Sequence, residues 1–443
     1  MRTSTGVLVL AVAVVGAGVA GGGPAAASPA RPEAVKETRD PLLWPFARTS
    51  IWNTPIGARA RYVPARIHSI GFGVDVDWFV VTRASDPSVP VYMPATFGEG
   101  RCGGTGDQQQ PPRHPEARRT QHLRRSFLIP DATTHAAVHG TPNSSSAFLQ
   151  PDRKTLVSYS VTARCRRGGP LYGQWFGETS LYGDGIAGGH GGSAMSSIGG
   201  SIRTGELTGR APIRHALKLD VWGRYLFYDA ATGGRRWPAT LADGGASSQY
   251  RGRVRALRMG ALLALPPSAT AAELGVRSPI GRKVLAALRD YGGYVVDESG
   301  LDAVELCVEH QATVDFRKRT GHDIEADAGL RADMARMVRA LAVVDDNGAS
   351  AVGGHGARRA AWAPPFRAPG TPAPKAAPAA AAPRTLTTPP TSAIKAGQVA
   401  ELAPVRQAPA TALWALVAAA LGLLLGGLWG GRRITGPRST RGY

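Results

Sequence analysis

The sequence predicts a mainly β domain, a sandwich or jelly roll with a few packed α-helices, followed by one C-terminal transmembrane helix. Segments 74–81, 156–161 and 215–221 alternate apolar and polar residues with the period of a β-strand, at least at their starts. Clusters of Gly, Pro and Asp separate these segments, as expected for turns. Helical periodicity appears only late in the domain, so we expect strands to form the core and helices to pack on it.

Two helices are expected in the last third of the domain. Ser278 is a good N-cap before Pro279 at the first helical position, and Gly292 is a natural stop. A second helix is expected near 326–344, where apolar residues recur at helical spacing. That stripe consists of Leu330, Met334, Met337, Val338 and Leu341. We interpret it as a core-packing face.

The first 27 residues are typical of a secretory signal peptide. Arg2 supplies the positive charge, 6–20 form an apolar run too short to span a bilayer, and Ala25 to Ala27 offer a small-residue cleavage site. We therefore expect residues 31–361 to form an exported domain.

The C-terminus predicts a membrane anchor. Residues 362–410 are rich in Ala and Pro and are expected to form an extended, disordered linker. Residues 411–431 are uncharged, are rich in Leu and Ala, and are long enough to cross the hydrocarbon core. The tail 432–443 carries arginines and no acidic residue, which favours a cytoplasmic location. The sequence thus predicts a single-pass cell-membrane protein whose domain lies outside the cytoplasm.

The formal net charge of +20 is not interpreted as nucleic-acid binding. Of the 52 basic residues 45 are Arg, and they are scattered along the chain without a basic helix or an RNA-binding motif. An acidic wall polymer is a better explanation for a basic exported surface. The sequence indicates no cofactor and no metal, and it sets no oligomeric state.

The three cysteines point to one disulfide bond in an oxidising compartment. We expect Cys102 to pair with Cys165, and Cys307 to be a small buried hydrophobic residue. His135 and His139, four residues apart beside Asp131, have a spacing that suits a metal. No metalloprotein signature supports them, so no metal site is predicted there.

The best candidate site is the glycine-rich stretch 182–207. Glycine is costly in entropy and is accepted where the chain needs positive φ or passes close to another group. The side chains embedded there and shortly after can transfer protons and hold an anionic or hydroxylated ligand. The candidate catalytic residues are Asp184, His190, Arg203, Glu206 and His215, and the candidate substrate-binding residues are Tyr182, Trp175 and Ser193. A set of tight turns held by backbone hydrogen bonds is the alternative explanation.

The same stretch carries a resemblance. Together with 213–218, 236–239 and 291–297 it resembles a largely uncharacterised group of exported bacterial proteins of the actinobacterial type. The resemblance extends to 44–53 near the start and 340–347 near the end. It implies a single module and supplies no reaction.

Two classes of function are consistent with these observations. The first is a polysaccharide-active enzyme of the cell envelope. In a lyase, Arg203 would neutralise a uronate, His190 or His215 would take the proton, and Tyr182 would protonate the leaving oxygen. In a glycoside hydrolase, Glu206 and an Asp would share the acid and base roles. The lack of a Gly-x-Ser-x-Gly elbow argues against an α/β-hydrolase. The second class is a non-catalytic surface protein that binds glycan or a partner.

Overall fold

The computed structural model describes residues 37–69, 71–92, 128–134 and 144–368. These residues belong to one compact unit of the chain. The predicted signal peptide, membrane helix and tail lie outside them, as does almost all of the linker. In the part that the structure describes, no helix is both long and apolar enough to cross a membrane. The anchor at 411–431 therefore stays a prediction.

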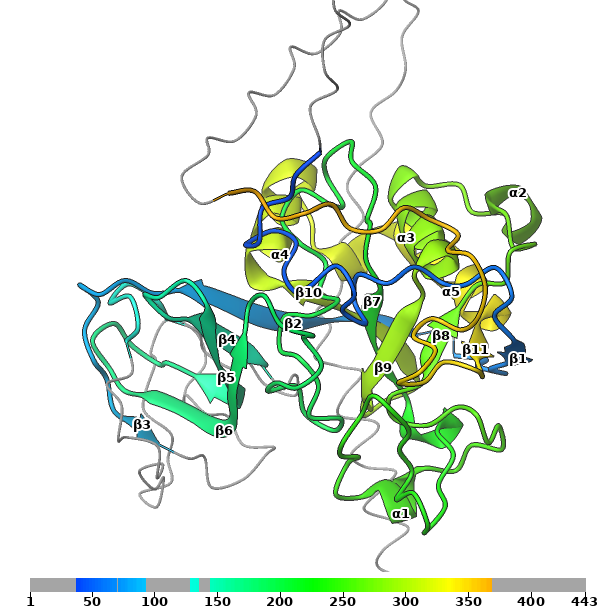
Figure 1. Ribbon diagram of the computed structural model, residues 1–443, viewed down its shortest axis with the longest axis horizontal. Helices are drawn as coiled ribbons and strands as arrows, with labels where there is room; N and C mark the ends of the chain where they lie inside the picture. The colour runs from blue at the N-terminus through cyan, green and yellow to red at the C-terminus, as the bar shows by residue number, and fades with distance from the viewer. Residues whose placement is uncertain (1–36, 70, 93–127, 135–143, 369–443) are drawn as a thin grey trace, which may run out of the picture. The chain divides into compact units, whose positions relative to one another are not determined.

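A mixed sheet of eleven strands is the centre of the described fold (Figure 1). In chain order the strands are β1 (Tyr62–Pro64), β2 (Gly71–Val81), β3 (Val91–Tyr92), β4 (Ser146–Leu149), β5 (Thr155–Ala163), β6 (Leu171–Ser180), β7 (Leu217–Val221), β8 (Leu262–Ala264), β9 (Gly293–Asp297), β10 (Ala303–Glu309) and β11 (Ala342–Val344). Their order in the sheet is β1-β11-β8-β9-β7-β10-β2-β4-β5-β6-β3. The pairs β10–β2, β2–β4, β7–β9 and β3–β6 are parallel, and the others are antiparallel.

This architecture contradicts the predicted β-sandwich or jelly roll. A sandwich requires two sheets packed face to face, whereas here one sheet contains the strands and helices cover it. Figure 1 shows α3, α4 and α5 on one side of the strands and the α1 segment on the other. The prediction failed because β8, β9 and β11 are short runs with every residue buried, and β10 is buried at most positions. Strands covered on both faces lose the alternation that identifies a strand in sequence.

Strand β2 joins two parts of the sheet. Its first seven residues, 71–77, pair with β10, and the next four, 78–81, pair with β4. A large hydrophobic core lies between the helices and β7 to β11, and a smaller one lies under β4, β5 and β6. The predicted strands at 74–81 and 156–161 are confirmed as parts of β2 and β5, and the strand predicted at 215–221 is confirmed as β7, which begins at Leu217.

The helices are α1 (Ala246–Gln249), α2 (Ala271–Leu274), α3 (Pro279–Asp290), α4 (His310–Thr320) and α5 (Ala328–Ala340), with short 3₁₀ turns η1 (Gly223–Tyr225) and η2 (Ile324–Ala326). The predicted start of α3 is confirmed, since the Ser278 side chain accepts a hydrogen bond from the Gly281 N–H. The second predicted helix, 326–344, extends too far. Helix α5 ends at Ala340, and Ala342–Val344 form β11, so a buried strand had been interpreted as the last helical turn.

Contacts of the described fold continue past the predicted domain boundary at 361. Arg39 Nε donates to the Pro364 carbonyl over 2.7 Å, and the Arg367 N–H donates to the Arg39 carbonyl over 2.8 Å. Cys165 is disulfide-bonded, and Cys307 is a free thiol in the core, as expected. The predicted partner Cys102 lies outside the described residues, as do His135 and His139.

Candidate functional site

The predicted site residues fall into three separate places. His190 lies in a buried polar cluster over the sheet. Arg203, Glu206 and His215 form a second network at the surface of the core. Asp184 and Tyr182 lie in an exposed turn. The structure therefore does not bring the predicted catalytic group together in one cleft.

The buried cluster is built by three adjacent strands and one loop. Asp75 and Asp77 lie two residues apart on β2, so they project from the same face. Lys218 and Asp220 likewise project from one face of β7, and Cys307 lies on β10, which pairs with both β2 and β7. All five side chains are at most 2% exposed. The glycine-rich loop places the completely buried ring of His190 over this polar face.

The contacts to His190 are longer than strong hydrogen bonds. Its Nε2 lies 3.3 Å from Asp75 Oδ2, 3.7 Å from Asp77 Oδ1 and 3.6 Å from the Cys307 sulfur. Its Nδ1 lies 3.7 Å from Oδ2 of Asp297, at the end of β9. Hydrogen bonds to charged groups usually measure about 2.7–2.9 Å.

Lys218 is the cation of this cluster. Its Nζ lies 2.9 Å from Asp77 Oδ2 and donates to the carbonyls of Ser196 and Ser197 over 3.1 and 3.0 Å. The Ser201 hydroxyl donates to the same Asp77 oxygen over 2.7 Å. The lysine therefore ties the glycine-rich loop to β2.

Burial controls the protonation of this cluster. Desolvation raises the pKa of Asp77, although Lys218 and His190 oppose the shift. Desolvation and the neighbouring carboxylates raise the pKa of Asp220 and of the Cys307 thiol well above their usual values. Desolvation and the Lys218 charge lower the pKa of His190 to about 3, so its imidazole is neutral at physiological pH.

The glycines of the loop allow its close approach to the sheet. A Cβ on Gly189 would lie 2.7 Å from the Tyr159 carbonyl, and one on Gly188 would lie 2.6 Å from the Ser196 Cα. Ser193 is completely buried: its N–H donates to the Val296 carbonyl, and its hydroxyl accepts from the Met195 N–H. The hydrogen bonds described for Ser193 thus tie the loop to β9 and hold the turn that follows Ser193.

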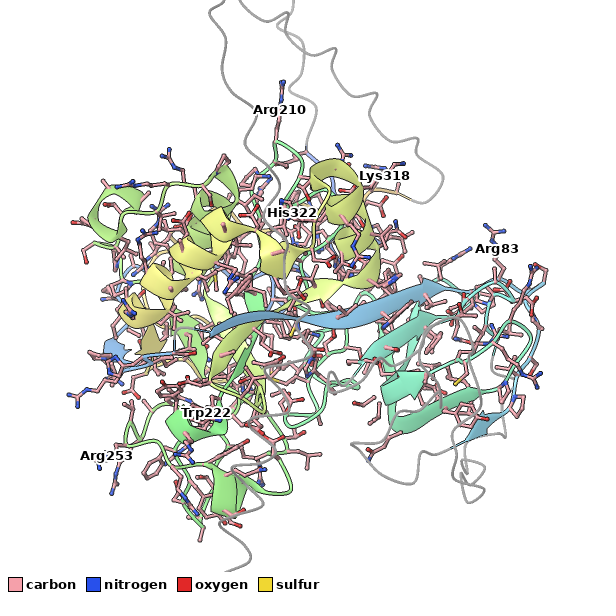
Figure 2. The ribbon with its side chains drawn as sticks, turned by 180° about the vertical axis from the view of Figure 1, so that it is seen from behind. Arg83, Arg210, Trp222, Arg253, Lys318 and His322 are labelled. Atoms are coloured by element: carbon pink, nitrogen blue, oxygen red, sulfur yellow. The ribbon has the colours of Figure 1, made fainter. Side chains whose placement is uncertain are left out.

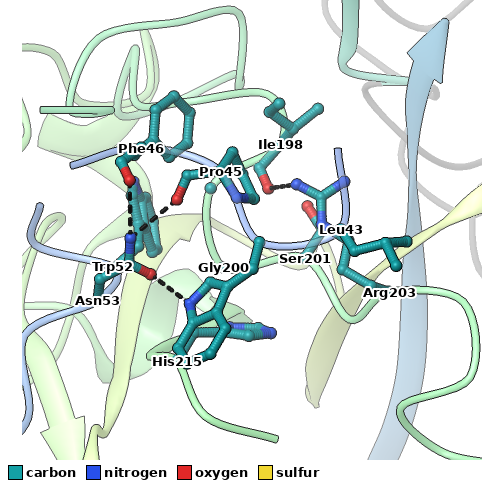
Figure 3. Close-up of a pocket in the computed structure, with 12 residues that line it drawn as sticks. Leu43, Pro45, Phe46, Trp52, Asn53, Ile198, Gly200, Ser201, Arg203 and His215 are labelled. Atoms are coloured by element: carbon teal, nitrogen blue, oxygen red, sulfur yellow. Dashed lines mark hydrogen bonds between the residues drawn. The ribbon is translucent and has the colours of Figure 1, made fainter. Parts of the chain in front are cut away.

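Arg203, Glu206 and His215 form the second network. Glu206 Oε2 accepts from the Arg203 N–H over 2.6 Å and lies 3.1 Å from His215 Nε2. The Arg203 guanidinium donates to Ile198 O over 2.6 Å and to Glu309 over 3.1 Å. The pocket beside Arg203 and His215 (Figure 3) offers about 10 Å³ of free space, close to what one water molecule needs. It is too small for a sugar ring.

The His215–Glu206 pair predicts a pH-dependent stability. Burial alone would lower the pKa of His215, but the charge and hydrogen bond of Glu206, with the Ala216 carbonyl, outweigh it and raise the pKa. The ion pair of protonated His215 with Glu206 therefore stabilises the fold fully below the unfolded pKa of about 6.5. This stabilisation is lost as pH rises through the folded pKa. We expect Glu206→Gln to cost more stability at about pH 5.5 than at about pH 9. Urea unfolding of wild type and variant at both values checks this, and an equal loss at both contradicts it.

Of the remaining predicted residues, Tyr182 and Asp184 lie in an exposed turn. The Asp184 carboxylate accepts from the Ile186 N–H, and Tyr182 is 39% exposed with its ring edge-on to Phe366 at 5.0 Å. Trp175 belongs to β6, and the structure does not describe its side chain.

Two larger surface pockets lie at strand ends. The first, of about 420 Å³, is the Trp222 pocket; it is lined by Trp222, Gly223, Arg224, Ser248, Gln249, Arg251, Glu298 and Gly300. The second, of about 370 Å³, is the Trp78 pocket; it is lined by Trp78, Phe79, Val80, Val81, Pro130, Ala132, Thr133, Thr134, Glu309, His310 and Gln311. Both are large enough for a sugar unit.

Sequence reasoning missed the partners of His190, although a signal for them existed. Asp75-x-Asp77 and Lys218-x-Asp220 place charges two residues apart inside otherwise apolar strands. Charges on a buried strand face are rarely tolerated without a partner or a function. The sequence matches no protein-family model, no curated protein and no solved structure. The resemblance to exported bacterial proteins therefore stays a prediction.

Proposed function

We propose that this chain is an extracytoplasmic protein of the cell envelope that binds acidic polysaccharide in the Trp222 pocket. The observation that supports it most is an exposed pair of arginines beside a tryptophan in a pocket of sugar-unit size. The predicted signal peptide, linker and membrane helix would hold this pocket on the outer side of the membrane.

The position of the pocket follows from the topology. Strands β7 and β9 are parallel neighbours, so their carboxyl ends lie at the same edge of the sheet. Trp222 and Gly223 follow β7, and Glu298 follows β9. Ligands of α/β sheets commonly bind outside the carboxyl ends of parallel strands. Figure 2 shows Trp222 on the side of the sheet opposite to the large helices.

Two hydrogen bonds donated by backbone N–H groups fix the wall of the Trp222 pocket. The Gly223 N–H donates to Glu298 Oε2 over 3.1 Å, and the Arg251 N–H donates to the Gly223 carbonyl over 3.3 Å. A Cβ on Gly223 would lie 3.0 Å from the same Glu298 oxygen, which favours glycine at this position. The Trp222 ring is supported by Tyr225, whose ring is edge-on at 6.0 Å.

The charges suit an acidic glycan. The Arg224 guanidinium lies over the Trp222 ring at 5.1 Å, and Arg251 lies beside it, bonded through Nη1 to the Ser247 carbonyl. Neither arginine forms an ion pair with a carboxylate of the described residues. A guanidinium matches a uronate carboxylate in shape and charge, and Ser248 and Gln249 offer partners for sugar hydroxyls.

The Trp78 pocket favours a second candidate function, a polysaccharide-cleaving enzyme. Glu309 and His310 lie side by side there, and the His310 ring stacks on Trp78 at 3.9 Å. Desolvation lowers the pKa of His310, so the imidazole is neutral and able to accept a proton. Glu309, which lines this pocket, forms an ion pair with Arg203 of the predicted catalytic group.

A pair of tryptophan variants tests the preferred function. We expect Trp222→Ala to weaken binding of an acidic polysaccharide at least about tenfold, because it removes the flat face and the support of Arg224. Trp78→Ala is the matched control and should bind like wild type. Affinity is measured by titration calorimetry, with thermal unfolding to confirm that both variants fold. Equal binding by wild type and Trp222→Ala would exclude this pocket.

A further inference from the structure

Four side chains of the buried cluster have the geometry of a metal site. We call them the buried quartet: Asp75, His190, Asp220 and Cys307. Each offers one ligand atom, and these atoms all lie within 4.8 Å of one another. All four side chains are at most 2% exposed. They come from three neighbouring strands and the glycine-rich loop, so a bound ion would fasten the loop to the sheet.

Three separations within the quartet are close to the edges of a tetrahedron around zinc, and the remaining ones are at most 4.8 Å. Bonds of about 2.0–2.1 Å to nitrogen or oxygen and about 2.3 Å to sulfur place ligand atoms about 3.3 Å apart, or about 3.6 Å when one is sulfur. His190 Nε2 lies 3.3 Å from Asp75 Oδ2 and 3.6 Å from the Cys307 sulfur, which lies 3.7 Å from Asp220 Oδ1.

The surroundings resemble a second coordination shell. With Nε2 of His190 facing the quartet, its Nδ1 faces Asp297 Oδ2 at 3.7 Å, which is beyond hydrogen-bonding distance. A carboxylate behind a ligating histidine is the usual arrangement at zinc sites, because it fixes the tautomer and the ring orientation. Nearby, Asp77 Oδ1 is buried, accepts no hydrogen bond from any described residue, and lies 3.7 Å from the same His190 Nε2. An acceptor oxygen is thus turned toward the quartet without a donor.

Charge balance favours a cation in the same place. Asp75, Asp77 and Asp220 are all buried, and Lys218 already lies against Asp77. Buried carboxylates are tolerated when they are paired or coordinate a metal. A dication within the quartet would offset most of the negative charge of Asp75, Asp220 and the Cys307 thiolate.

We propose that the buried quartet binds one zinc ion, in contrast to the sequence-based expectation of no metal. An imidazole and a thiolate beside carboxylates suit Zn²⁺, whereas Ca²⁺ and Mg²⁺ require oxygen ligands. Four protein ligands leave no open position, so the site is structural and holds the loop around His190 in place. This site is independent of the Trp222 pocket.

Metal content of the purified full chain tests the proposal. Because the quartet is enclosed, zinc is supplied while the chain folds, during expression and during refolding after chelation. We expect about one equivalent of zinc per chain after dialysis. Cys307→Ser and Asp220→Asn should each weaken zinc binding more than about tenfold. Asp333→Asn is the control, since Asp333 is equally buried but bonds to backbone N–H groups before α3.

The absorption spectrum of the cobalt-substituted protein is a second test, which wild type alone can fail even if a variant does not fold. Wild type refolded with Co²⁺ should show the near-ultraviolet thiolate-to-cobalt absorption, and Cys307→Ser should lack it. Three results would overturn the proposal. They are no retained zinc in wild type, full zinc retention in folded Cys307→Ser and Asp220→Asn, or a cobalt complex without thiolate absorption.

Discussion

Replacing Lys218 with Met is expected to destabilise the protein by about 3–5 kcal/mol, the usual cost of removing one partner of a buried ion pair. The Lys218 side chain is completely buried, and its Nζ contacts Asp77 Oδ2 at 2.9 Å together with two carbonyls of the glycine-rich loop. Without the ammonium, Asp77 stays in the core with the Ser201 hydroxyl and an uncompensated charge. Both the ion pair and the attachment of the loop to β2 are lost.

Urea unfolding measures this loss, and two further variants identify its cause. Asp77→Asn in the Lys218→Met background should recover part of the stability, because it removes the unpaired charge. Lys283→Met is the matched control, since Lys283 bonds only to the carbonyls of Glu206 and Gly209 among the described residues. Its loss should be about 1–2 kcal/mol. A loss below about 1 kcal/mol for Lys218→Met would contradict the buried pair.

Gly200→Ala is expected to cost about 2–5 kcal/mol. Gly200 has φ +75°, where an L-residue with a side chain is strained by about 1–2 kcal/mol. In addition, a Cβ would lie 2.5 Å from the Trp52 ring. That ring is 1% exposed, and its Nε1–H donates to the Gly185 carbonyl over 2.6 Å, so it cannot move aside freely. Overpacking adds about 1–3 kcal/mol.

Gly205→Ala separates the two contributions. Gly205 also has positive φ, at +84°, but a Cβ there would meet nothing within 4 Å. It should therefore cost only the backbone strain of about 1–2 kcal/mol. The free energies of unfolding of both variants, with near-ultraviolet circular dichroism to monitor Trp52, check this. Equal losses for Gly200 and Gly205 would show that the packing of Trp52 against the loop is wrong.

Local signals predicted local structure. The alternation around Asp75 located β2, and Ser278 with Pro279 located the start of α3. The arrangement of strands could not be predicted in the same way, because it depends on pairing between distant segments. Residues 303–309 form β10 between β2 and β7, yet their burial at most positions removes the periodicity that marks a strand. A single mixed sheet was therefore mistaken for a sandwich.

The candidate site was likewise predicted only in its local part. Glycine density identified the loop that carries His190, and the close approaches of Gly188 and Gly189 explain that density physically. Proximity in sequence then grouped His190 with Arg203 and Glu206, although the fold gives them different partners. The partners of His190 come from β2, which precedes the loop, and from β9 and β10, which follow it far along the chain. Only the fold could show this.

The central claim is that the protein binds acidic polysaccharide without cleaving it. The most direct measurement incubates the purified chain with neutral and acidic polysaccharides and isolated cell wall. It records binding, new reducing ends and the absorbance of unsaturated uronates together. We expect saturable binding to acidic polymers that weakens with salt, and no product of either kind. Products that still form with Trp222→Ala but not with Glu309→Gln would contradict binding alone and identify the Trp78 pocket as an active site. Binding to no polysaccharide would refute the proposed function itself.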